Sequence, residues 1–209
     1  MIALLKGVPS QVQQRQDILR DVQPSDVTFI GDSITAQGLW SEYFSDGFSV
    51  ANRGFPSATT ADVLNQLPSL TATNARLYLL MMGVNDVLAT PLTPRQIADN
   101  LLAIRTNLLE YAPRSRVIVQ STLECRLDFC GVNALESIRE INGYLEAQLP
   151  PSSFLDLNHR LVDGSGLRAV YTYDGVHLNS KGYRIWRSLV HPVILQEIRT
   201  RMESSSMSS

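Results

Sequence analysis

The sequence predicts an α/β fold, a three-layer α/β/α sandwich around a central, mostly five-stranded parallel sheet. Two observations support this prediction. Short apolar segments alternate with helical patterns along the chain, and the most apolar segment shows no alternation of polar and apolar residues. Strands that are separated by helices are joined by right-handed crossovers, which make the sheet parallel and cover both of its faces.

Five segments are expected to form the strands, because each is short and apolar and is followed by turn or polar residues. They are residues 27–30, 48–51, 77–82, 117–119 and 154–157. The third segment is apolar throughout, which is typical of a parallel strand covered on both faces. We therefore expect it to lie in the middle of the sheet.

The clearest helical pattern covers residues 93–112. Thr93 is a suitable N-cap, Pro94 fits the first turn, and Gln96 completes a capping box. A second amphipathic pattern covers residues 134–149.

The last helical pattern is expected to begin at a Ser180 cap, and Pro192 should kink it or divide it in two. The 209 residues suit a single domain, which we place at 1–202. Residues 203–209 have no apolar side chains to bury beyond one methionine and are expected to be disordered.

Charge and hydropathy limit the partners and the location. The formal net charge of -2 gives no broad basic field, so we expect no nucleic acid and a small-molecule partner instead. No apolar stretch approaches the roughly 20 residues that span a bilayer, and residues 1–5 are too few for a signal-peptide core. We expect a cytoplasmic protein without an integral membrane segment, and a leader already removed stays an alternative.

The two cysteines, Cys125 and Cys130, are expected to be reduced, as is usual in a cytosolic protein. A disulfide that closes a short loop is the alternative. Two cysteines alone are too few ligands for a structural zinc site.

Polar segments follow the first three expected strands. They are Gly-Asp-Ser-Ile-Thr at 31–35, Asn-Arg-Gly at 52–54 and Gly-Val-Asn-Asp at 83–86, and a fourth segment, Asp-Gly-Val-His, lies at 174–177. The carboxyl ends of parallel strands meet at one edge of a sheet, so these side chains can share a crevice. A serine hydroxyl becomes a nucleophile when a histidine removes its proton and an acid orients that histidine. The chain offers all three groups.

These four segments resemble, in family order, the four sequence blocks of the SGNH (GDSL) hydrolases, which contribute a serine, a glycine, an asparagine and a histidine. The resemblance spans most of the chain. Ile34 and Val84 depart from the usual leucine and threonine, but neither position supplies catalytic atoms. The resemblance implies the flavodoxin-like fold of these hydrolases and a serine esterase that needs no cofactor and no metal.

By this resemblance, Ser33 is the nucleophile and His177 is the general base. Asp174, three residues before the histidine, is expected to bind the other ring nitrogen and to fix its tautomer. Asp32 is expected to be structural and to accept hydrogen bonds from backbone amides.

The resemblance also implies an oxyanion hole formed by the amides of Ser33 and Gly54 and by the side chain of Asn85. A glycine suits this position, because without a Cβ its N–H can approach an oxyanion closely.

The substrate is expected to be a small-molecule ester with a short acyl group, since the chain leaves no room for a separate lid domain. Segments 125–132 and 160–173 are expected to frame the cleft. They would present Leu127, Phe129, Leu161, Val170 and Tyr171.

Several alternatives stay open. The same residues could transfer the acyl group to a sugar or another alcohol, or could act as a thioesterase or lysophospholipase. A non-catalytic flavodoxin-like or receiver-like module would instead use Asp32 and Asp86 to hold Mg²⁺. The sequence does not indicate the oligomeric state.

Overall fold

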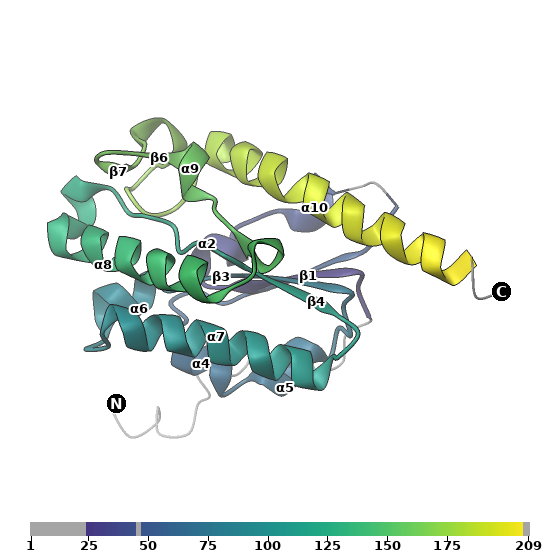
Figure 1. Ribbon diagram of the computed structural model, residues 1–209. Helices are drawn as coiled ribbons and strands as arrows, with labels where there is room; N and C mark the ends of the chain where they lie inside the picture. Colours follow the sequence, from purple (N-terminus) through teal and green to yellow (C-terminus); the bar gives the residue numbers. More distant parts are fainter. Residues whose placement is uncertain (1–23, 45–46, 207–209) are drawn as a thin grey trace, which may run out of the picture.

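The computed structural model describes residues 24–44 and 47–206 and contains a five-stranded parallel sheet with helices on both faces (Figure 1). The strand order is β2-β1-β3-β4-β5, so β3 lies in the middle. The predicted fold class is confirmed. The strands are β1 (Val27–Gly31), β2 (Val50–Gly54), β3 (Leu77–Met81), β4 (Arg116–Gln120) and β5 (Phe154–Leu155).

The second strand lies later in the chain than predicted. The ladder between β1 and β2 runs from the pair Val27 and Val50 to the pair Gly31 and Gly54, so β2 includes the polar Asn52. A polar residue is tolerated there because the amide nitrogen of Asn52 lies 3.1–3.2 Å from three backbone carbonyls. Apolar patterning alone therefore misplaced this strand.

An apolar core lies between each face of the sheet and the helices that cover it. Phe29 and Leu79 face one core, whereas the next residues along their strands, Ile30 and Leu80, face the other. Helices α3 (Trp40–Tyr43), α9 (Asn158–Leu161) and α10 (Ser180–Ser206) cover the first face, and α4 (Thr60–Leu64), α5 (Leu67–Thr71) and α7 (Pro94–Tyr111) cover the second (Figure 1). Helix α8 (Leu127–Gln148) contributes to both cores.

The remaining elements are short. They are the helices α2 (Ser33–Ala36) and α6 (Val84–Ala89), the 3-10 turns η3 (Pro151–Ser153) and η4 (Ala169–Tyr171), and an antiparallel hairpin of β6 (Val162–Asp163) and β7 (Gly166–Leu167).

The predicted capping box of α7 is confirmed, since Thr93 and Gln96 exchange side-chain and backbone hydrogen bonds. Helix α8 begins earlier than expected and has a break at Gly131, where φ is 77°. The predicted helix over 134–149 is therefore only the second part of α8.

The C-terminal helix differs from its prediction in three ways. Asn179, not Ser180, caps it, because the Asn179 side chain accepts hydrogen bonds from two backbone amides of the first turn. Pro192 does not divide α10, which is a single helix from Ser180 to Ser206. Val190 and Ile194 on either side of the proline are both fully buried. The helix also continues to Ser206, into the segment for which we expected disorder.

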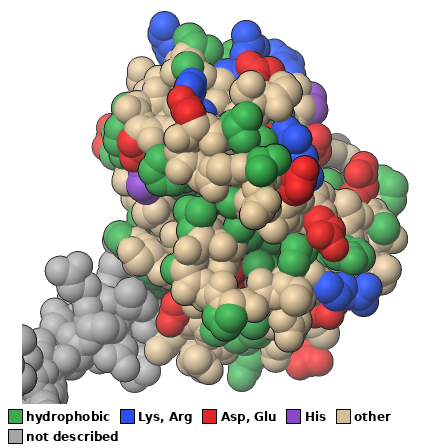
Figure 2. Space-filling model, turned by 90° about the vertical axis from the view of Figure 1, so that its left-hand side faces the viewer, with side chains coloured by type: hydrophobic (Ala, Val, Ile, Leu, Met, Phe, Trp, Pro, Cys, Tyr) green, Lys and Arg blue, Asp and Glu red, His purple; other side chains and the backbone are tan. Residues whose placement is uncertain are grey.

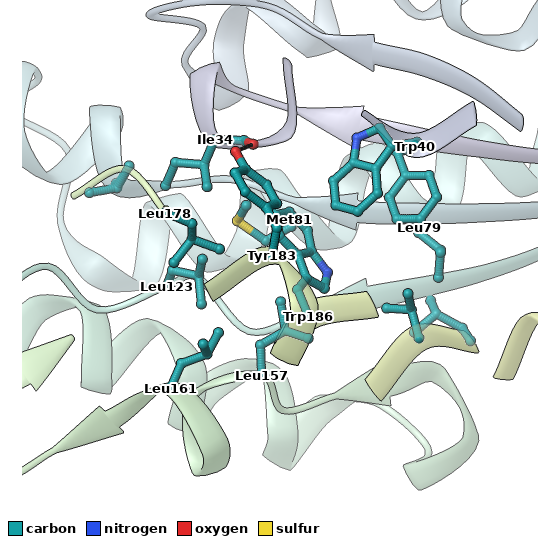
Figure 3. Close-up of a cluster of buried hydrophobic side chains, with 14 of the residues drawn as sticks. Ile34, Trp40, Leu79, Met81, Leu123, Leu157, Leu161, Leu178, Tyr183 and Trp186 are labelled. Atoms are coloured by element: carbon teal, nitrogen blue, oxygen red, sulfur yellow. Dashed lines mark hydrogen bonds between the residues drawn. The ribbon is translucent and has the colours of Figure 1, made fainter. Parts of the chain in front are cut away.

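An aromatic cluster fixes the position of α2 (Figure 3). The indole N–H of Trp40 donates to the Thr35 carbonyl at 2.8 Å, and the Tyr183 hydroxyl donates to the Ile34 carbonyl at 2.6 Å. Trp40 stacks on Phe29 of β1 at 4.1 Å between ring centroids, and Trp186 meets Trp40 edge to face at 4.7 Å. The short helix is thereby held against both the sheet and α10.

The side chain of Asp32 caps α2 from within the core. It is fully buried, and its Oδ1 accepts a hydrogen bond from the Ile34 N–H at 2.9 Å. Its Oδ2 has no hydrogen-bond partner. Burial raises the pKa of Asp32 from 3.8 to about 7, although the bond from Ile34 opposes this rise.

The first prediction concerns Trp186, whose indole N–H donates to Gln120 Oε1 at 2.7 Å. Trp186→Phe should lower the free energy of unfolding by about 1–3 kcal/mol, because it leaves a buried acceptor unpaired. The control is Tyr111→Phe, which removes the polar tip of an exposed aromatic residue. Urea-induced unfolding measures both variants, and equal stabilities would show that the buried hydrogen bond contributes nothing.

The second prediction concerns Asp32. Between pH 4 and pH 7 the folded state holds its proton while the unfolded state loses it, so wild-type stability falls as the pH rises. Asp32→Asn cannot ionise, so its stability relative to wild type should rise by up to about 4 kcal/mol between pH 4 and pH 8. Urea unfolding at several pH values tests this, and a difference that is constant with pH would contradict it.

Candidate active site

The structure brings together three of the predicted residues at the carboxyl edge of the sheet. Ser33 begins α2 directly after β1, and its Oγ lies 2.9 Å from Nε2 of His177. The other ring nitrogen of His177 lies 2.6 Å from Oδ2 of Asp174. Serine, histidine and carboxylate therefore form one continuous chain of hydrogen bonds.

A tight turn over residues 172–177 holds the histidine. Oδ1 of Asp174 accepts hydrogen bonds from the N–H groups of Val176 and His177, at 2.9 and 2.8 Å. The Thr172 hydroxyl donates to the His177 carbonyl at 2.7 Å and accepts from the Gly175 N–H at 2.9 Å. Thr172 was missed in the sequence, although a hydroxyl two residues before an aspartate is a common turn signal.

The environment of Asp174 favours its ionised form. Partial burial raises its pKa, but the hydrogen bonds from Val176 and His177 outweigh burial, and the pKa lies below its ordinary value. Asp174 is therefore a carboxylate at neutral pH and can stabilise a protonated imidazole.

Two hydrogen-bond donors follow the carboxyl ends of the paired strands β1 and β3. The Ser33 N–H is at the start of α2, and no acceptor for it occurs among the described residues. Asn85 lies in the first turn of α6, after the neighbouring strand β3, and its Nδ2 donates to the Ala58 carbonyl at 3.0 Å. An amide group carries two N–H donors, so one of them stays available.

The structure gives Gly54 a packing role, and its part in the oxyanion hole stays a prediction. Its N–H donates to Oδ1 of Asn52 at 2.9 Å, and a Cβ added at this position would lie 2.2 Å from the Ala36 nitrogen. Gly54 thus lets β2 approach the backbone of α2. Asn52 was missed as a site residue, and its amide binds the carbonyls at the end of that helix.

The loop after β2 contains a strained residue. Ser57 has a φ of 61°, a left-handed conformation that is uncommon for residues other than glycine. It precedes Ala58, whose carbonyl binds Asn85. Strain of this kind concentrates at functional sites, and here it borders the Asn85 donor.

Asp86 has a structural role. Its carboxylate accepts hydrogen bonds from the Thr60 N–H at 3.0 Å and from the Thr60 hydroxyl at 2.6 Å, which ties α4 to α6. Burial raises its pKa. Asp32 likewise binds backbone, so the two carboxylates proposed for a receiver-like Mg²⁺ site are both engaged in holding helices.

The expectation of reduced cysteines is wrong, because Cys125 and Cys130 form a disulfide, with their Cα atoms 6.2 Å apart. The disulfide joins a residue just before α8 to the first turn of that helix. This segment lies beside the turn over residues 172–177, since the Arg126 N–H donates to the Gly175 carbonyl at 2.8 Å. Disulfides are typical of oxidising compartments, so this one counts against the cytoplasmic location that we expected.

The predicted cleft residues divide into two groups. Leu161 is fully buried in the core and cannot line a cleft, because its side chain packs under α10. Leu127, Phe129 and Val170 are exposed as expected, between 40 and 52%. Figure 2 shows this end of the molecule, where hydrophobic side chains are interspersed with acidic and basic ones.

Within the described part of the chain, no helix has the length and apolar character needed to cross a membrane.

Comparison with known proteins gives relatives of low identity. N-acylneuraminate cytidylyltransferase of Escherichia coli O18:K1:H7 is 22% identical over 198 residues, which cover 92% of this chain and 45% of that protein. The chain thus spans less than half the length of this curated relative.

Solved structures share the fold. A GDSL-like lipase from Bacteroides thetaiotaomicron has a TM-score of 0.75 at 22% identity, covering 89% of this chain and 98% of its own. A carbohydrate esterase family 3 protein from Talaromyces cellulolyticus has a TM-score of 0.66 at 20% identity, covering 86% and 99%.

Residues 29–185 match the family model described as the GDSL-like Lipase/Acylhydrolase family. The match includes Ser33, Asn85, Asp174 and His177. Since it covers most of the chain, the protein belongs to the GDSL-like lipase/acylhydrolase family.

Proposed function

We propose that the protein is a serine esterase that cleaves a carboxylic ester through an acyl-enzyme on Ser33. The observation that carries this proposal is the chain of hydrogen bonds from Ser33 Oγ to His177 at 2.9 Å and from His177 to Asp174 at 2.6 Å. This arrangement of hydroxyl, imidazole and carboxylate is what nucleophilic catalysis by serine requires.

In the first half of the reaction, Ser33 Oγ attacks the ester carbonyl carbon while its proton passes to Nε2 of His177. The tetrahedral intermediate collapses, the bond to the alcohol oxygen breaks, and His177 returns the proton to that oxygen. Asp174 stays ionised and stabilises the transient imidazolium. In the second half, His177 takes a proton from water while the hydroxide attacks the acyl carbonyl carbon. The second tetrahedral intermediate collapses, the bond to Ser33 Oγ breaks, and His177 returns the proton to that oxygen as the acid leaves.

The oxyanion of each intermediate would be stabilised by the Ser33 N–H and by the second N–H of the Asn85 amide. Both groups are positioned by the sheet, since each follows the carboxyl end of one of two paired strands. The start of α2 adds the partial positive charge of its free amides.

A short acyl group is part of the proposal. Ser33 is only half-buried, and the side chains of His177 and Asp174 are 23 and 37% exposed, so the reacting atoms lie near the surface. A shallow site suits a small acyl group, because a long chain needs a deep apolar cavity to leave water.

The third prediction tests the nucleophile. Ser33→Ala should lower kcat/KM for p-nitrophenyl acetate by at least about 10³-fold and abolish labelling by a fluorophosphonate, since both need the hydroxyl. The control is Ser188→Ala, which removes an exposed hydroxyl on α10. If the Ser33 variant releases nitrophenol as fast as the control, the proposed mechanism is excluded.

The fourth prediction tests the oxyanion donor. Asn85→Ala should lower kcat by about 10²- to 10³-fold, because the amide is needed most in the transition state. Asn107→Ala is the matched control, since the Asn107 amide also donates to a backbone carbonyl, that of Ala103 at 2.7 Å, but lies on α7. Equal kcat values for the two folded variants would remove Asn85 from the oxyanion hole.

A further inference from the structure

We propose that a groove beside Asp174 binds the alcohol part of the ester and that this alcohol is a sugar or a similar polyol. The inference rests on the proposed esterase function. The groove has a volume of about 360 Å³, and Arg126, Phe129, Tyr173 and Asp174 are among its lining residues. It continues into a second hollow of about 580 Å³ that shares Arg126 and reaches Arg168.

The position of the groove assigns it to the leaving alcohol. His177 Nε2 returns the proton to the alcohol oxygen, so the alcohol part of the ester must lie on the histidine side of the site. The groove is lined by neither Ser33 nor His177 and lies past the imidazole, at the Nδ1 edge that binds Asp174. The Tyr173 ring lies nearly parallel to the imidazole at 6.0 Å between centroids, so an alcohol part large enough to extend across the histidine would enter the groove. The Tyr173 hydroxyl also donates to Gln37 at the end of α2, which links the groove to the nucleophile helix.

The opposite wall is built to keep its shape. The Cys125–Cys130 disulfide closes the turn that carries Phe129. This turn packs on the catalytic turn so closely that a Cβ added at Gly175, where φ is 98°, would lie 2.7 Å from the Cβ of Phe129. A fixed wall lowers the entropy lost when a ligand binds.

The lining suits a polyol better than an alkyl chain. Two aromatic rings are open to solvent, Phe129 at 52% and Tyr173 at 64%, and can accept the C–H face of a sugar ring. The ion pair of Arg126 and Asp128 lines the same groove, with further N–H donors of Arg126 left over. The hydroxyl groups of a polyol can hydrogen-bond to these charged side chains. An alkyl chain would displace the water that binds them and would offer no hydrogen bonds in its place.

The charges also argue against a phosphate headgroup. The two hollows together are lined by two arginines and three aspartates, so they present no excess of positive charge. A phosphodiester would meet carboxylates beside each arginine, which disfavours its binding.

The test compares two acetate esters in one assay of acetate release, methyl 6-O-acetyl-glucopyranoside and ethyl acetate. The measured quantity is the ratio of their kcat/KM values, because the ethyl group is too small to fill the groove. Wild type should favour the sugar ester. Phe129→Ala should lower the ratio by up to about tenfold, as expected for the loss of a ring contact. Phe129→Tyr keeps the ring and should restore the wild-type ratio, and Tyr111→Ala, an exposed aromatic residue of α7, should not change it.

Three results would overturn the groove proposal alone. The first is a wild-type ratio of one or less, and the second is an equal loss of activity on both esters in Phe129→Ala. The third is that Phe129→Ala instead loses its selectivity between p-nitrophenyl octanoate and p-nitrophenyl acetate, which would make the groove an acyl pocket. If wild type hydrolyses none of these esters, the proposed function fails, and the groove proposal fails with it.

Discussion

The placement of the four-residue helix α2 is the constraint on which the candidate site depends. A single turn of helix is not stable by itself, so its position comes from surrounding contacts. Asp32 binds its first turn, the Asn52 amide binds its last carbonyls, and the Tyr183 hydroxyl binds the Ile34 carbonyl. Asp32 is the N-cap of α2 itself, whereas Asn52 lies in β2 and Tyr183 in α10, so two distant segments must be in place before Ser33 meets His177.

Much of this arrangement could be predicted from the sequence, because parallel strands must place their following residues at one edge. The apolar runs of β1 and β3 predicted where Ser33 and Asn85 would lie. Strand β2 was harder, since its polar Asn52 is compatible with a strand only because its amide binds carbonyls of another element. The hydrogen bond from the Gly54 N–H to Asn52 could not be predicted for the same reason.

The walls of the site were less predictable than its centre. Leu161 and Phe129 are both large and apolar and both lie in segments that were expected to frame the cleft, yet Leu161 in α9 is fully buried and Phe129 in α8 is half exposed. The difference depends on how these two segments fold back against the rest of the protein. Long-range hydrogen bonds fix this arrangement, such as the bond from the Arg126 N–H to the Gly175 carbonyl. Local patterns carry no information about such bonds. The disulfide was missed for another reason, because the expected compartment and not the short spacing of the two cysteines decided between the alternatives.

Electrostatics distinguish the two aspartates that accompany the triad. Asp32 is adjacent to Ser33 in the chain, but full burial raises its pKa to about 7. Asp174 receives hydrogen bonds from Val176 and His177, which hold its pKa below the ordinary value despite burial. A carboxyl that must stabilise an imidazolium has to be ionised while the reaction proceeds. The two environments therefore support the proposed orienting role of Asp174, and Asp32 is the cap that holds α2.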